Sequence, residues 1–150
     1  MKRNDAIAFF LHFEPQPPTV THQEKKFGGV TKNGTPIFYP TPALANARAA
    51  LTAKLMAFAP EKPWTCPVSL SCRWTFRAPV GRKAGYMTRK PDTDNLQKML
   101  KDVMTDCGFW KDDAQVVVEN VEKIQLPAER RHGITILVRD VSDTFRDNGF

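Results

Sequence analysis

The sequence has few cysteine and histidine residues and no long hydrophobic run. Its three cysteines, Cys66, Cys72 and Cys107, include no CxxC pair, and its three histidines are scattered. Three cysteines, an odd number without CxxC spacing, predict neither a disulfide framework nor a zinc site. They indicate reduced thiols in a cytoplasmic protein. The apolar run of residues 6–13 is interrupted by His12, which leaves it too short for a membrane span or a secretory signal. No membrane association is therefore expected.

The composition is that of an ordinary globular protein with an excess of positive charge. The chain has 150 residues, of which 41% are hydrophobic and 25% charged, and this suits one compact domain. Lysine and arginine outnumber aspartate and glutamate by 22 to 16, which gives a net charge of +6. An excess of this kind favours nucleic acid or an anionic membrane surface. A merely basic soluble protein has the same net charge, so the distribution of charge must decide.

Apolar periodicity predicts an alternation of strands and helices. Residues 68–77 give the clearest strand signal, because apolar and polar side chains alternate there. The stripe from Leu96 to Cys107 recurs at helical spacing and ends at Gly108, a typical residue after a helix. We therefore predict one α+β domain of residues 1–150, with two helices on a mixed four-stranded sheet. The predicted elements are strands at 5–14, 68–77, 114–124 and 133–139, helices at 42–58 and 95–107, and a frayed tail at 141–150.

The stretch between the first strand and the first helix, residues 15–40, is rich in proline and glycine. This composition predicts a long irregular loop that contains a short hairpin around Asn33-Gly34. A loop of this length in a compact domain is often functional. Its three lysines suit contact with a phosphate backbone, although a solvated surface loop explains the same composition.

Positive charge is concentrated directly before a pair of aspartates. Residues 73–90 contain six basic side chains and no acidic one, and Asp92 and Asp94 follow immediately. The basic residues are Arg73, Arg77, Arg82, Lys83, Arg89 and Lys90. Side chains two residues apart in an extended chain point the same way, and paired carboxylates suit Mg²⁺, a hard cation that favours oxygen ligands. The basic run therefore predicts contact with a DNA backbone beside a bound cation.

The acidic residues also have simpler explanations. Asp94 precedes an apolar helix and can serve as its N-cap, an explanation that does not cover Asp92. Asp112 and Asp113 offer a third carboxylate, because the strand that ends near residue 90 and the strand that begins near residue 113 are expected to be neighbours. Only one of these two is expected to join the first pair, and the spacing does not choose between them. A polar turn is the alternative.

Lys98 lies four residues after Asp94 and thus on the same face of the predicted helix. It either pairs with Asp94 or Asp102 at the surface, or orients a carboxylate and stabilises charge on the scissile phosphate. The sequence pattern alone favours the surface pair.

Residues 90–124, KPDTDNLQKMLKDVMTDCGFWKDDAQVVVENVEKI, closely resemble the signature of the RusA family of Holliday-junction resolvases. The shared elements are D-x-D-N-L-x-K and, after a short helix, a G-F-W-x-D-D-x-Q-V block. The resemblance is looser upstream, and residues 19–40 depart from it.

This resemblance implies a four-stranded α+β subunit that acts as a homodimer on four-way DNA junctions. It implies that Asp92, Asp94 and Asp113 bind the metal, with Mn²⁺ as a substitute for Mg²⁺, and that Lys98 is part of the catalytic site. It also implies paired symmetric nicks in DNA recombination and repair, without a small-molecule cofactor, by a cytoplasmic protein of bacterial or phage origin. A non-catalytic branched-DNA-binding module and a nuclease for flaps or RNA are the alternative functions.

Overall fold

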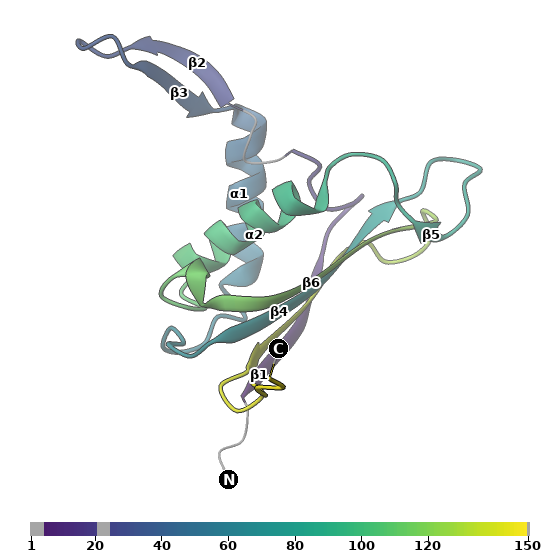
Figure 1. The fold of residues 1–150 in the computed structure, drawn as a ribbon. Helices are drawn as coiled ribbons and strands as arrows, with labels where there is room; N and C mark the ends of the chain where they lie inside the picture. Colours follow the sequence, from purple (N-terminus) through teal and green to yellow (C-terminus); the bar gives the residue numbers. More distant parts are fainter. Residues whose placement is uncertain (1–4, 21–24, 150) are drawn as a thin grey trace.

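The computed structural model describes residues 5–20 and 25–149, which form a central sheet, two helices and a projecting hairpin (Figure 1). The central sheet has five strands in the spatial order β1-β7-β4-β6-β5. These strands are β1 (Ala6–His12), β4 (Val68–Arg77), β5 (Gly85–Tyr86), β6 (Val116–Leu126) and β7 (Gly133–Asp140). The other elements are α1 (Pro42–Leu55), α2 (Thr93–Asp106), the short 3₁₀ turn η1 (Asp113–Gln115) and the hairpin strands β2 (Lys25–Val30) and β3 (Pro36–Pro40).

The central sheet is mixed, because one pair of its strands is parallel. β1 pairs with β7, and β7 with β4, in antiparallel fashion. β4 and β6 are parallel, so the chain between them must cross back along the sheet. α2 lies in that crossover. The residues that directly precede α2 and the turn η1 that follows it therefore lie at opposite ends of the helix (Figure 1).

The predicted α+β class and element order are confirmed, but the sheet has five strands rather than four. The strand expected at 68–77 is β4, with the same bounds. The additional strand, β5, consists of two residues inside the basic loop and exists through its antiparallel pairing with β6. Two residues are too few to show a period, so the apolar pattern could not reveal this strand. The hairpin expected around Asn33-Gly34 is confirmed as β2 and β3.

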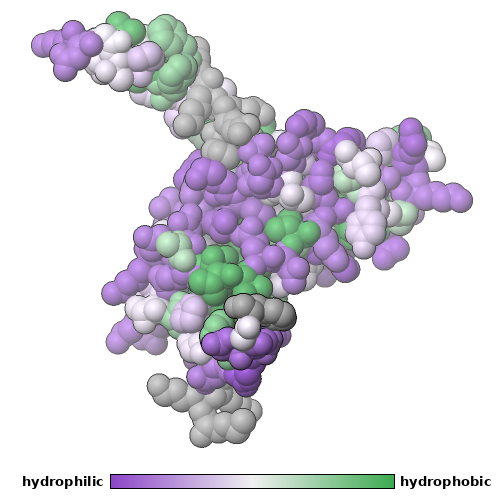
Figure 2. Space-filling model, viewed as in Figure 1, coloured by the Kyte–Doolittle hydropathy of each residue, from purple (hydrophilic) through white to green (hydrophobic). Residues whose placement is uncertain are grey.

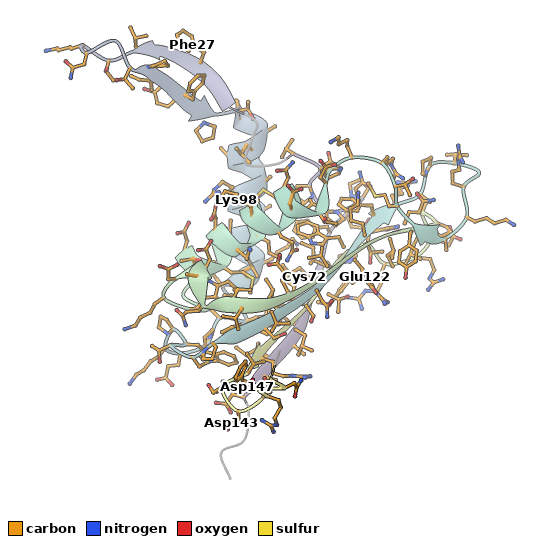
Figure 3. The ribbon with its side chains drawn as sticks, viewed as in Figure 1. Phe27, Cys72, Lys98, Glu122, Asp143 and Asp147 are labelled. Carbon is orange, nitrogen blue, oxygen red and sulfur yellow. The ribbon has the colours of Figure 1, made fainter. Side chains whose placement is uncertain are left out.

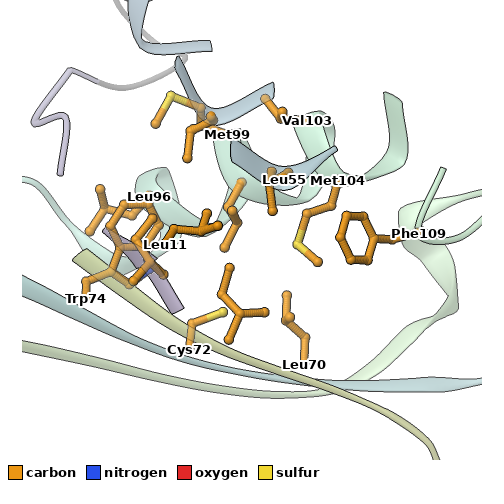
Figure 4. Close-up of a cluster of buried hydrophobic side chains, with 14 of the residues drawn as sticks. Leu11, Leu55, Leu70, Cys72, Trp74, Leu96, Met99, Val103, Met104 and Phe109 are labelled. Carbon is orange, nitrogen blue, oxygen red and sulfur yellow. The ribbon is translucent and has the colours of Figure 1, made fainter. Parts of the chain in front are cut away.

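The core lies between the two helices and one face of the sheet (Figure 4). β4 turns Leu70, Cys72 and Trp74 inward, as the alternation predicted. α2 packs against them with a buried stripe that includes Met99 and Leu100, both fully buried. Burying an apolar side chain of this size contributes about 1.5–3 kcal/mol, so this interface holds α2 firmly on the sheet.

The first helix begins where the sequence predicted. Thr41 is its N-cap, and the Thr41 Oγ1 atom accepts a 3.2 Å hydrogen bond from the backbone N–H of Leu44. Pro42 occupies the first turn, where its missing N–H costs nothing. The helix ends at Leu55 rather than at residue 58. None of the described helices is long and apolar enough to cross a membrane.

The opposite face of the sheet carries neither α1 nor α2 and is named here the helix-free face. At its centre, Arg73 and Glu122 lie in register on β4 and β6. Their side chains form an ion pair with 2.6 Å between Arg73 Nε and Glu122 Oε2. Thr135 and the half-buried Leu137, from β7, line a shallow hollow beside this pair.

Candidate active site

The two aspartates that follow the basic run lie at the N-terminus of α2. Asp92 occupies the N-cap position, with φ −75° and ψ 150°, but its carboxylate makes no capping hydrogen bond. Instead, Asp92 Oδ2 accepts a 2.8 Å hydrogen bond from Lys90 Nζ, and 48% of the Asp92 side chain is exposed. Asp94 is exposed in the first turn of the helix, where the helix dipole stabilises negative charge. The interpretation of Asp94 as the N-cap is therefore wrong.

Lys123, a residue that the sequence pattern does not single out, holds the backbone that precedes Asp92. Its Nζ atom donates hydrogen bonds to the carbonyl oxygens of Arg89, at 2.7 Å, and Pro91, at 2.8 Å. Burial lowers the pKa of Lys123; the positive charges of Arg89 and Lys90 lower that pKa further, while the negative charge of Asp92 opposes them. The only available signal was a lysine on the core side of β6, in register with Trp74.

Two of the six basic residues assigned to DNA contact hold the basic loop, residues 78–91, in place. Arg89 donates through Nη1 to Gln125 Oε1, at 2.6 Å, and through Nη2 to the carbonyl oxygen of Arg77, at 2.9 Å. Lys90 pairs with Asp92. These contacts tie the loop to β4, to β6 and to the start of α2.

The other four basic residues differ in their surroundings. Arg82 and Lys83 are exposed, and Arg82 borders a hollow formed with Tyr86 and Thr88. Arg77 is exposed at the end of β4. Arg73 lies on the helix-free face, where Glu122 neutralises its charge. Arg82, Lys83 and Arg77 are thus the basic side chains that remain available for phosphate near the loop.

Asp113 lies at the other end of α2 from Asp92 and Asp94. It follows the helix in η1 and borders a hollow with Asp102 and Asp106, from the last turns of α2. A helix of 14 residues is about 21 Å long. Among the described residues, no three His, Cys, Asp or Glu side chains are placed to hold one metal ion. The expectation that neighbouring strands bring the three aspartates together is therefore wrong within a single chain.

Asp112 has a structural role that its neighbour does not share. Asp112 Oδ1 accepts a 2.9 Å hydrogen bond from the backbone N–H of Ala114, and Gln115 Oε1 accepts one of 3.0 Å from the backbone N–H of Asp112. This reciprocal capping box fixes η1. Asp113 is half-buried beside it. The capping box engages the carboxylate of Asp112 and leaves the carboxylate of Asp113 for another partner.

Lys98 is exposed on α2, one turn beyond Asp94 (Figure 3). The surface pair that the sequence favoured is not formed, because within the described chain Lys98 has no carboxylate at ion-pair distance. The next lysine along the helix, Lys101, does pair, with 3.0 Å between its Nζ atom and Glu119 Oε2. The ammonium group of Lys98 therefore faces solvent on the helix that carries Asp94.

The relation of this chain to known proteins agrees with the pattern of residues 90–124. The family model described as Endodeoxyribonuclease RusA matches residues 15–139. The chain belongs to the RusA family. A RusA relative, the crossover junction endodeoxyribonuclease of Lactococcus phage r1t, is 30% identical over 139 residues, which cover 90% of this chain and 100% of the relative.

Two further RusA proteins match a shorter region at higher sequence identity. The crossover junction endodeoxyribonucleases of Escherichia coli K12 and of Enterobacteria phage 82 are each 48% identical over 48 residues. That region covers 32% of this chain and 40% of each relative. The RusA resemblance stated from the sequence is confirmed.

Proposed function

We propose that this chain is a Mg²⁺-dependent endodeoxyribonuclease that resolves four-way DNA junctions by paired symmetric nicks, in DNA recombination and repair. Family membership supports a nuclease, and the relatives are named crossover junction endodeoxyribonucleases. The observation that carries the proposal is the start of α2. There, two exposed or half-exposed carboxylates, Asp92 and Asp94, directly follow a basic loop.

The residues at this helix terminus fit a magnesium ion. Mg²⁺ in phosphate-processing sites is held by one or two carboxylates together with substrate phosphate and water. The carboxylate of Asp92 is not used in a helix cap, and the cation beside it is an exposed lysine, Lys90, on a flexible side chain. The chemistry that a bound Mg²⁺ supplies is charge neutralisation at the scissile phosphate and acidification of a water molecule.

The surrounding residues orient the DNA and the carboxylates. Asp92 and Asp94 hold the cation, and Lys123 fixes the backbone from which Asp92 projects. Lys98 presents positive charge one turn further along α2, where it stabilises charge that develops on the phosphate. The exposed Arg82 and Lys83 bind the DNA backbone without reading its sequence.

The separation of Asp113 from the other two aspartates supports a homodimer. If all three carboxylates serve one metal site, as we predict, Asp113 must come from a second copy of the chain, because α2 keeps it away from Asp92 within one copy. A two-fold symmetric dimer also presents two equivalent sites, as symmetric nicks on a four-way junction require. The helix-free face, with the half-buried Leu137, offers a surface for the second copy.

A substrate panel tests this function directly. The full chain is incubated with a four-way junction, a flap, a uniform duplex and RNA, each with Mg²⁺, with Mn²⁺ or with EDTA. We expect paired nicks in the junction with either metal and none with EDTA. Junction binding without cleavage under every condition would instead assign a non-catalytic module. Preferential cutting of flaps or RNA would assign a nuclease of different specificity.

A further inference from the structure

The hairpin of β2 and β3, residues 25–40, projects from the body of the molecule and is here named the arm (Figure 1). None of the described core residues comes from the arm. Its aromatic side chains stay exposed: Phe27 by 59%, Phe38 by 56% and Tyr39 by 54%. An isolated two-stranded hairpin is only marginally stable, and aromatic groups gathered on such an element mark an interaction site.

The register of the arm distributes these aromatic rings over both of its faces. Phe27 lies opposite Phe38, and their ring centroids are 5.9 Å apart in an edge-to-face arrangement. Tyr39 is the next residue on β3 and therefore points to the other face. There its ring lies over Gly28, where any Cβ atom would overlap it. Gly28 thus makes room for a ring on the second face, and the arm offers aromatic surface on both sides.

The charge of the arm restricts the chemistry of its partner. Residues 25–40 contain three lysines and no aspartate or glutamate. Lys32 is exposed at the turn, and Figure 2 shows the hydrophilic tip of the arm next to its hydrophobic side chains. The lysines favour an anionic partner, whereas the exposed rings favour planar groups on which they can stack. Nucleic acid with unstacked bases provides both, because its phosphates attract lysine and its bases stack on aromatic rings.

We propose that the arm stacks its aromatic side chains on nucleobases at the branch point of a DNA junction, while Lys32 at its turn binds a flanking phosphate. This inference rests on the proposed action on junctions. In a uniform duplex each base is covered by its neighbours, whereas stacking is interrupted at a branch point. Base–aromatic stacking therefore adds affinity at the branch point that a duplex does not provide. The arm accordingly selects junctions over duplex DNA.

The test compares the wild-type chain with the double variant Phe27→Ala/Phe38→Ala. Phe145→Ala is the matched control, because Phe145 is 80% exposed but lies outside the arm. Binding is measured in EDTA, to prevent cleavage, with a four-way junction that carries 2-aminopurine beside the branch point and with a uniform duplex. We expect the double variant to bind the junction about tenfold more weakly or worse, to lose the fluorescence change, and to bind the duplex as wild type does. Phe145→Ala should behave as wild type.

Each other outcome is decisive. Unchanged junction affinity and fluorescence in the double variant would overturn the role of the arm, even if wild type cuts junctions normally. A wild-type chain that neither binds nor cuts junctions would defeat the proposed function itself. Sedimentation of the double variant as a smaller assembly than wild type would assign the arm to a contact between copies.

A second variant keeps the test independent of the folding of the hairpin. Lys32→Gln removes one exposed charge at the turn and no aromatic ring. We expect it to reduce the slope of log binding constant against log salt concentration by about 0.7–0.9, the value for one lost phosphate contact. An unchanged slope would contradict phosphate binding by the arm.

Discussion

Lys123 Nζ donates a 2.8 Å hydrogen bond to the carbonyl oxygen of Pro91, the residue directly before Asp92. A second hydrogen bond, of 2.7 Å, reaches the carbonyl oxygen of Arg89. The segment that carries Asp92 is thus held by a side chain of β6, in addition to the contacts that Arg89 and Lys90 make within the loop. The position of this carboxylate depends on a residue that lies outside both the basic loop and α2.

Replacing Lys123 tests this positioning role. We expect Lys123→Met to reduce the rate of junction cleavage about tenfold or more, because a 1 Å displacement of a reacting group is enough for a large loss of rate. Lys123→Arg, which can still donate to both carbonyl oxygens, should recover part of the rate. Lys101→Met is the control, because it breaks the ion pair with Glu119 and leaves this loop intact. Equal losses in Lys123→Met and Lys101→Met would show that Lys123 acts only on general stability.

Variants of the three aspartates test the shared site. Asp92→Asn, Asp94→Asn and Asp113→Asn should each abolish cleavage and leave junction binding intact, because asparagine keeps the shape but removes the charge. When Asp92→Asn and Asp113→Asn chains are mixed, each mixed dimer should contain one intact site, with Asp92 from one copy and Asp113 from the other. We expect single nicks to return in a gel assay of the mixture. Sites built within one chain would give no recovery.

The exposed part of the basic loop is expected to set the salt dependence of binding. Neutralising two residues, in Arg82→Gln/Lys83→Gln, should weaken junction binding and reduce the slope against log salt by about 1.8, or about 0.9 for each lost phosphate contact with duplex arms. Lys62→Gln/Arg146→Gln changes the net charge equally at exposed or tail positions outside the loop and should leave the slope almost unchanged. Identical slopes in the two variants would remove the loop from the DNA surface.

The helix-free face should hold the second copy. Leu137→Glu places a charge on a half-buried position of that face without entering the core. We expect sedimentation to show monomers and the cleavage assay to show no product, since burying an added carboxylate in such an interface costs its hydration and sets it in competition with Glu122 for Arg73. Met56→Glu, at the exposed end of α1, should remain dimeric and active. A dimeric Leu137→Glu variant would place the interface elsewhere.

The buried thiol of Cys72 makes stability depend on alkaline pH. Burial raises the pKa of this thiol to about 12, from an ordinary value of 9.0. The unfolded chain therefore loses the thiol proton first, and the free energy of unfolding should fall as the pH rises above 9.0. Urea titrations should show a shallower decline for Cys72→Ala.

Thiol labelling offers an independent check on Cys72. At pH 8 iodoacetamide should modify the half-exposed Cys66 and Cys107 but spare Cys72 in the folded chain, as mass spectrometry can show. Rapid labelling of all three thiols under native conditions would mean that Cys72 is accessible.

The fold was predictable where one periodic pattern determines an element. β4 alternates along its whole length, and α2 has a continuous apolar stripe, so the sequence indicates both without tertiary information. β5 was not predictable, because its two residues become a strand only through pairing with β6. The start of α1 was predictable, because Thr41 has a capping side chain. Its end at Leu55 was not, because no such signal marks it.

Only those residues of the site that are close together in the sequence were predictable. The pair Asp92 and Asp94 stands out beside the basic run, whereas Lys123 is brought to them by the pairing of strands. The position of Asp113 depends on the direction of a crossover, and hydrophobic spacing carries no information on that direction. Asp92 shows a further limit: it is at the N-cap position by backbone geometry, yet its side chain does not cap the helix.

The parallel pairing of β4 with β6 also constrains how the chain can fold. Arg73 and Glu122, partners across these strands, are 49 residues apart in sequence, so a large loop must close before this pair can form. Contacts of such long range slow folding, and we expect the sheet to be completed after α2 has docked. A nascent or stalled chain that lacks β6 also lacks β7, so both edges of β4 would be exposed, and chaperone binding or aggregation should begin there.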